Sequence, residues 1–162
     1  MDDALGAVHE QLDRRVEQLE SSVLAGSVES SNEFRSLTRE LLHHMAWEDQ
    51  FLFPAVKRVA TAKERRSIES LEIDHDRLRD TLGSLESTLA AGDFGTAGTL
   101  VRWLRTLLAG HNYDEEHGVY VEADRLLSRA DRRRLIAQAS AEEGPPASSE
   151  TSPRGSPEQK HP

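Results

Sequence analysis

The sequence of 162 residues contains no cysteine, which excludes disulfide bonds, thiolate metal ligands and a cysteine nucleophile. No apolar run approaches the roughly 18 residues that span a membrane, and the acidic N-terminal residues lack the apolar region of a signal peptide. We therefore expect a cytoplasmic protein without a membrane partner. The formal net charge of −9 argues against non-specific binding to nucleic acid.

Proline is scarce in most of the chain, because five of the six prolines fall within residues 141–162. That segment, AEEGPPASSETSPRGSPEQKHP, contains no large apolar residue. A segment of this composition cannot bury enough surface to become ordered. We therefore expect one domain over residues 1–140 and a disordered tail, rich in Pro, Ser and Glu, over residues 141–162.

Before the tail, apolar residues recur at alternating steps of three and four, the pattern of helices that pack in a bundle. Four such stripes run over residues 5–23, 34–59, 68–89 and 97–108, and a shorter helical segment follows at about residues 129–139. The connections between the stripes are short. The sequence therefore predicts an all-α protein, an up-down-up-down four-helix bundle with a short C-terminal helix.

Several residues predict where these helices begin or bend. Ser30 with Glu33, and Thr61 with Glu64, have the spacing of a capping box, and Asp93 can cap the fourth helix. Pro54 lies inside the second stripe, where it removes a backbone donor and predicts a kink.

Polar residues interrupt each stripe at positions that continue it toward the bundle axis. Because residues four apart project from one face of a helix, each HxxxE pair can aim both side chains at one point. A lone buried His is usually satisfied by a hydrogen bond, and a lone HxxxE is a common helical ion pair. Inward polar positions in all four helices favour a metal site over those alternatives. The residues are His9, His44, Glu48, His75, His111 and Glu115.

The same polar pattern occurs twice in the chain. The segment that begins at His9 aligns with the one at His75, 66 positions later, and the segment at His44 aligns with the one at His111, 67 positions later. This alignment pairs Glu48 with Glu115 and Asp49 with Glu116. The sequence therefore predicts two similar helical hairpins related by a pseudo-twofold axis, an arrangement that suits a dinuclear metal centre.

Four imidazoles and two carboxylates, without thiolate, suit iron, zinc or manganese. Ferritin-like dimetal bundles use more carboxylates, with a Glu-x-x-His motif. Here the order is His then Glu, the spacing is four, and nitrogen donors outnumber carboxylates. This set favours a redox-active pair of iron ions, with zinc or manganese as the alternatives.

The order H…HxxxE…H…HxxxE, with EDQFLFP following the second His, resembles the hemerythrin-like, or HHE, cation-binding domain over residues 1–140. The resemblance implies a bundle that holds two non-haem iron ions, bridged by two carboxylates and an oxo or hydroxo group. Carried over, Glu48 and Glu115 bridge the ions, and the remaining ligands are terminal: His9, His44, His75 and His111. Such domains bind or store oxygen, sense oxygen or iron, or handle peroxide or nitric oxide.

This sequence departs from the oxygen carriers of that family in two ways. The carriers have a fifth ligand His one turn from the third-helix His, and the positions one turn before and after His75 are here Leu71 and Arg79. Two coordination positions of the iron pair therefore remain open, against one in the carriers. The carriers' fourth-helix carboxylate corresponds in spacing to Glu116, which stays an alternative to Glu115. Side chains that could fill an open position are Tyr113, Tyr120, Glu116, Asp49, His43 and His117.

Open positions on adjacent iron ions favour turnover of peroxide over reversible carriage of oxygen. We therefore expect a small-molecule ligand, dioxygen, hydrogen peroxide or nitric oxide, with catalase-like, peroxidase-like or oxidase activity as one outcome. The alternative function is a sensor whose metal state alters contact with a protein partner. A metal-free interaction bundle is the third hypothesis.

Overall fold

The computed structural model describes residues 2–142, and within this range the chain is helical and contains no strand. The predicted tail from residue 143 onward lies outside the described residues, and the last helix continues to Glu142. In chain order the elements are α1 (Asp2–Leu24), α2 (Ser30–Trp47), η1 (Glu48–Leu52), α3 (Phe53–Lys57), α4 (Ala62–Ala90), α5 (Phe94–Asp114), η2 (Glu115–Val119), α6 (Tyr120–Leu126) and α7 (Arg129–Glu142).

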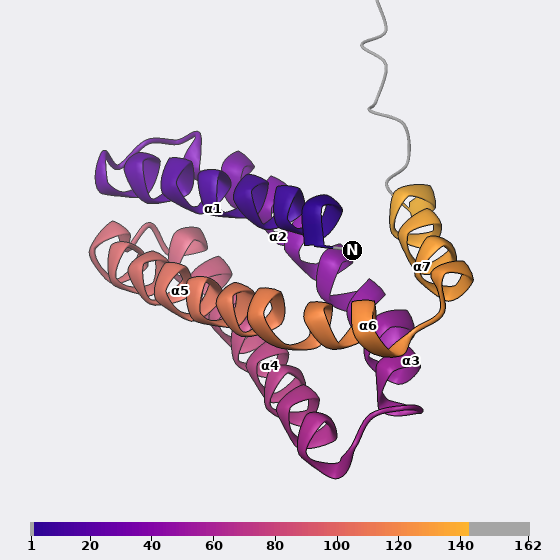
Figure 1. Ribbon diagram of the computed structural model, residues 1–162. Helices are drawn as coiled ribbons and strands as arrows, with labels where there is room; N and C mark the ends of the chain where they lie inside the picture. The colour runs from indigo at the N-terminus through magenta and orange to yellow at the C-terminus, as the bar shows by residue number, and fades with distance from the viewer. Residues whose placement is uncertain (1, 143–162) are drawn as a thin grey trace, which may run out of the picture.

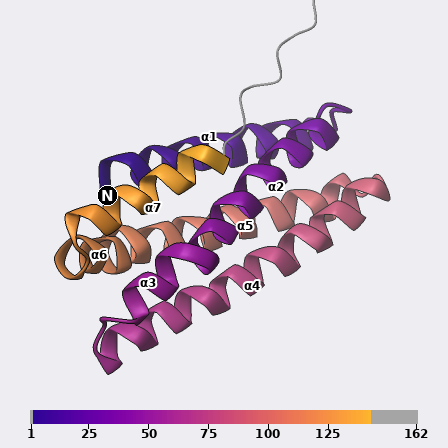
Figure 2. The same ribbon diagram turned by 90° about the vertical axis from the view of Figure 1, so that its right-hand side faces the viewer.

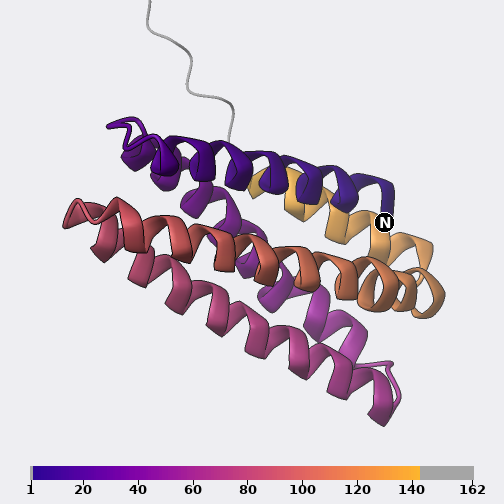
Figure 3. The same cartoon turned by 90° about the vertical axis from the view of Figure 1, so that its left-hand side faces the viewer.

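The long helices form a bundle in which α1 packs against α2 and α5, and α4 packs against the same two helices (Figure 1). Figure 2 shows α2 and α4 running in opposite directions, and Figure 3 shows the same for α1 and α5. The predicted up-down-up-down four-helix bundle is therefore confirmed. No helix of residues 2–142 is both long enough and apolar enough to cross a membrane.

The loops that close the two hairpins at one end of the bundle have the same backbone. Gly26 follows α1 with φ +63°, and Gly92 follows α4 with φ +72°, the left-handed conformation that glycine adopts without strain. Each loop is closed by a hydrogen bond of the Schellman type, from Ser27 N–H to Ser22 O and from Asp93 N–H to Thr88 O. The predicted pseudo-twofold repeat thus extends to the turns.

Two of the three predicted helix starts are confirmed. The Thr61 hydroxyl accepts a hydrogen bond from the backbone N–H of Glu64, whose carboxylate accepts from the backbone N–H of Thr61, so the capping box precedes α4. Asp93 caps α5 by accepting from Thr96 N–H at 3.0 Å. The predicted box at Ser30 is wrong, because Ser30 already belongs to α2 and its hydroxyl donates to Ser27 O instead.

The apolar interior consists of two clusters, separated by a polar layer. The four long helices contribute the first cluster, which includes Leu12, Leu41, Leu78 and Leu108. The second cluster lies at the other end of the bundle and includes Leu5, Trp47, Leu71, Phe53, Val119 and Tyr120. Along the chain, each predicted His lies near the boundary between the two clusters. The inward polar residues are therefore enclosed by apolar layers on both sides.

The last helix, α7, closes the second cluster. It packs against α2 at the end of the bundle where α1 begins (Figure 1). Leu135 of α7 is 6% exposed and belongs to this cluster, and its carbonyl accepts a hydrogen bond of 3.2 Å from the indole N–H of Trp47. Because Trp47 directly precedes Glu48, α7 supports the chain segment that enters the polar layer.

Candidate metal centre

Both helices that carry an HxxxE pair change to a π-helical turn at the glutamate. The backbone N–H of Phe53 donates to Glu48 O, and that of Tyr120 donates to Glu115 O, five residues back in each case. In an α-helix, residue i+5 is rotated about 140° from residue i. The wider π turn reduces this rotation, so the aromatic residue lies over the same side of the helix as the glutamate. Such turns occur frequently at functional sites.

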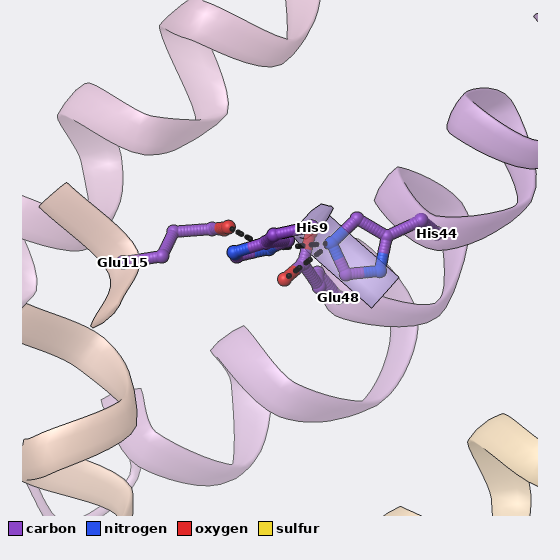
Figure 4. Close-up of side chains that lie close together, drawn as sticks. All are labelled: His9, His44, Glu48 and Glu115. Carbon is purple, nitrogen blue, oxygen red and sulfur yellow. Dashed lines mark hydrogen bonds and ion pairs between the residues drawn. The ribbon is translucent and has the colours of Figure 1, made fainter. Parts of the chain in front are cut away.

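The six predicted polar residues converge in the layer between the apolar clusters, and none is more than 6% exposed. They form two groups, each with ligand atoms within 4.8 Å of one another. We call the group of His9, His44, Glu48 and Glu115 position A (Figure 4), and the group of His75, His111, Glu48 and Glu115 position B. The two glutamates belong to both positions.

The distances show how the carboxylates connect the two positions. Glu48 Oε1 lies 3.5 Å from His44 Nε2, and Glu48 Oε2 lies 3.4 Å from His75 Nε2. Glu115 repeats this arrangement, with Oε2 3.2 Å from His9 Nε2 and Oε1 3.2 Å from His111 Nε2. Each carboxylate therefore presents one oxygen to an imidazole of position A and the other oxygen to an imidazole of position B.

Two further carboxylates orient the imidazoles from outside. His9 Nδ1 lies 2.8 Å from Glu116 Oε1, and His75 Nδ1 lies 2.8 Å from Asp49 Oδ1. Because an ionised carboxylate only accepts hydrogen bonds, both Nδ1 atoms carry the proton, and both Nε2 atoms face the centre. This carboxylate–histidine arrangement is the usual support of a metal-ligating imidazole. Asp49 and Glu116, which the sequence offered as further ligands, take the supporting place.

An aromatic ring stacks on one imidazole of each position. Phe53 lies against His75 with 5.4 Å between ring centroids, and Tyr120 lies against His9 at 5.6 Å. The Tyr120 hydroxyl also reaches the centre, donating to Glu48 Oε1 at 2.7 Å and lying 3.1 Å from His9 Nε2. Of the side chains that the sequence offered for an open position, Tyr120 is the one placed among the inward residues.

The charges in this layer shift several pKa values. Burial alone lowers the pKa of His9, but Glu115 and Glu116 outweigh it and raise the pKa to about 9. In the same way Asp49 and Glu48 raise the pKa of His75 to about 9 against burial. Burial dominates at His44 and lowers its pKa to about 4. At neutral pH and without a metal ion, His9 of position A and His75 of position B therefore carry a second proton and a positive charge.

The donor arrangement fits a metal cation. His9 Nε2 and His44 Nε2 face each other at 3.0 Å, and His75 Nε2 and His111 Nε2 at 3.1 Å. Two lone pairs this close repel unless a proton or a cation lies between them. Glu48 Oε2 and Glu115 Oε1 are buried and accept no hydrogen bond from the described residues. The Nε2 atoms of His75 and His111 lie 3.4 and 3.2 Å from these oxygens, and a cation between nitrogen and oxygen would bind both atoms. The layer is thus able to hold a metal.

The remaining sequence candidates lie away from the two positions. The Tyr113 ring is 60% exposed and stacks on His117 with 4.0 Å between centroids. His117 is exposed, and its Nδ1 donates to Tyr113 O. His43 is half-buried, and it belongs to neither group of inward residues. Geometry thus separates His44 from His43, as the stripe of apolar residues predicted.

Two features of the site were not inferred from the sequence. Arg79, noted only as the replacement of a ligand His, donates from Nη2 to Asp49 Oδ2 at 2.5 Å and so holds the residue that supports His75. The π turns, which bring Tyr120 over the centre, have no separate sequence signal. The repeat did contain a clue, because it aligns Asp49 with Glu116 and Phe53 with Tyr120.

Comparison with known proteins identifies the family of this chain. No curated protein and no solved structure matches this chain. The sequence model described as "Hemerythrin HHE cation binding domain" matches residues 1–123, a stretch that includes both positions and ends before α7. Because this match covers more than half of the 162 residues, the chain belongs to the hemerythrin HHE cation-binding domain family.

Proposed function

We propose that the polar layer binds two non-haem iron ions, one at position A and one at position B. The observation that carries this proposal is the sharing of Glu48 and Glu115, each of which offers one oxygen to either position. A carboxylate that serves two positions at once is typical of a dinuclear centre. Imidazole and carboxylate ligands without thiolate suit iron, and zinc and manganese are the alternatives that the metal content distinguishes.

We further propose that the centre reacts with dioxygen, hydrogen peroxide or nitric oxide, with peroxide turnover as the leading activity. Bound iron would supply the redox chemistry. The protein would supply imidazole nitrogens held in one tautomer by Asp49 and Glu116. It would also supply a phenolic proton on Tyr120 Oη, which is held at Glu48 Oε1, and apolar clusters on both sides that limit the entry of water.

The test is to measure metal content and reactivity in the full-length protein. About two iron ions per chain, with an absorption band that changes on removal of oxygen or addition of peroxide, is the expected result. One zinc ion per chain, or none, would overturn the proposal. Loss of peroxide no faster than with free iron would overturn the peroxide activity while leaving the dimetal centre in place.

Adjacent histidines provide a matched pair of variants. His44→Ala removes a donor of position A and should abolish most metal binding at that position. His43→Ala removes the same chemical group one residue earlier, outside both positions, and should leave the metal content unchanged. Equal losses in the two variants would contradict the assignment of His44.

A further inference from the structure

The two halves of the polar layer repeat one design, but they differ in charge. In each half, two imidazoles face each other and an outer carboxylate holds one Nδ1. Position B has an additional cation behind that carboxylate. Arg79 Nη2 donates to Asp49 Oδ2 at 2.5 Å, and Asp49 in turn holds His75 at 2.8 Å. A continuous path of hydrogen bonds therefore connects a guanidinium to an imidazole of position B.

Position A has an acidic residue where position B has this arginine. The repeat that aligns His9 with His75 places Asp13 at the position of Arg79. The Asp13 carboxylate accepts from the Asn112 amide at 3.4 Å. Burial raises the pKa of Asp13, the charge of His9 lowers it, and the charge of Glu116 raises it, so Asp13 lies close enough to interact with both of these residues. Within residues 2–142, the ion pair of Glu116 is with His9 and includes no arginine or lysine.

The aromatic rings that stack on His9 and His75 also differ, and the ring in position A is the more polar one. Tyr120 brings a hydroxyl oxygen to 3.1 Å from His9 Nε2, within position A. Its counterpart in the repeat, Phe53, stacks on His75 and has no polar atom. Position A thus has an additional oxygen atom, that of Tyr120, close to its ligand atoms. Position B instead has the positive charge of Arg79 nearby.

We propose that the two metal positions are inequivalent, and that a divalent cation binds more tightly at position A than at position B. This inference rests on the proposed dimetal centre. Arg79 is a positioning residue that acts through Asp49 and His75. Its charge weakens the negative field at position B, because a cation is repelled by a like charge, while its pairing with Asp76 at 3.1 Å and its 38% exposure reduce the size of this effect. Changes in the partners of ligating imidazoles typically alter metal affinity about 10–100-fold, so we expect a difference of about tenfold.

The test compares proteins in which one position is removed, using Co²⁺ as the probe because its binding is visible and involves no redox change. His111→Gln leaves position A, and His44→Gln leaves position B; the repeat makes these two substitutions equivalent. The first variant should bind Co²⁺ about tenfold more tightly than the second. Equal affinities, or tighter binding in His44→Gln, would overturn the inference.

Arg79→Gln tests the cause. In the His44→Gln protein, this second substitution should tighten Co²⁺ binding several-fold. In the His111→Gln protein, it should leave Co²⁺ binding unchanged. Arg79→Lys keeps the charge, and in the His44→Gln protein it should therefore give the weaker binding again. Arg77→Gln removes the same charge from the same helix, where Arg77 pairs with Asp74 outside the centre, and is the matched control. Weaker binding at position B in Arg79→Gln, or equal changes at both positions, would assign Arg79 a purely structural role and contradict the inference.

A measurement on the unaltered protein covers the case in which a ligand variant does not fold. On addition of one equivalent of Zn²⁺ to metal-free protein, the imidazole NMR signals of His9 and His44 should change before those of His75 and His111. Simultaneous changes would contradict the inference. Binding of only one ion, or none, by the unaltered protein would instead be the failure of the proposed dimetal centre itself.

Discussion

The Tyr120 hydroxyl donates a hydrogen bond of 2.7 Å to Glu48 Oε1 from a segment 72 residues later in the chain. This bond connects η1 to the start of α6, so it joins the two hairpins inside the polar layer. Both groups are fully buried. The bond therefore holds in place a carboxylate that positions A and B share.

Removing this hydroxyl should destabilise the metal-free protein. In Tyr120→Phe, Glu48 loses a buried donor, which typically lowers the free energy of unfolding by about 1–3 kcal/mol. Urea unfolding in the presence of a chelator measures the change. Tyr113→Phe removes the same atom from a ring that is 60% exposed and should have almost no effect. Equal stabilities of the two variants would show that the Tyr120 bond contributes nothing.

The outer carboxylates should matter for metal affinity more than for folding. Glu116→Gln replaces the charged acceptor of His9 Nδ1–H by a neutral amide, and we expect metal affinity to fall about 10–100-fold. Competition with a chelator provides the measurement. The control is Glu10→Gln, next to His9 in the sequence, because its side chain is 76% exposed and pairs with Arg14. A loss of affinity of the same size in both variants would indicate a general effect of charge.

The metal-free protein should be most stable near pH 6.5. The pKa of His9 and that of His75 are raised from 6.5 to about 9, so their protonation stabilises the fold fully below pH 6.5, and this stability is lost as the pH rises toward 9. The pKa of His44 is lowered to about 4. Below pH 6.5 the unfolded chain therefore takes up a proton that folded His44 does not, and stability falls again.

Thermal unfolding with a chelator at about pH 5, 6.5 and 8.5 checks this profile. His75→Gln should flatten the decrease on the alkaline side, and His117→Gln, which alters an exposed ring, should leave the profile as it is. Metal affinity should change in the opposite sense above pH 6.5, because binding displaces these protons. A metal-free stability that rises steadily from pH 6.5 to 9 would contradict the assignment of the imidazolium groups.

The sequence predicted the bundle and the inward direction of the six polar residues because both depend on helical periodicity alone. Leu41, His44 and Glu48 lie on one stripe, and the structure places all three in the interior. Their role as ligands stays a prediction. The contact of Asp49 with His75 was not predicted, because it depends on how η1 lies against α4, and no local pattern specifies which imidazole a carboxylate will reach.

The π turns, η1 and η2, are a feature of the backbone that the sequence did not predict either. A period of 3.6 residues placed Tyr120 off the stripe of Glu115, yet the wider turn brings its hydroxyl to 3.3 Å from Glu115 Oε2. The predicted kink at Pro54 was close to this feature, since η1 ends at Leu52 and Pro54 lies in the first turn of α3. Proline is not required for such a turn, however, because η2 forms in a segment without proline.

Replacement of Pro54 should therefore leave the centre intact. Pro54→Ala restores a backbone N–H but keeps Glu48 and Phe53, and the folding equilibrium should change by no more than about 1 kcal/mol, mainly through the greater freedom of the unfolded chain. Co²⁺ affinity and the visible spectrum of the bound ion should match those of the unaltered protein. A marked loss of affinity would mean that proline fixes the π turn at Glu48, and that the turn at Glu115 arises from a different cause.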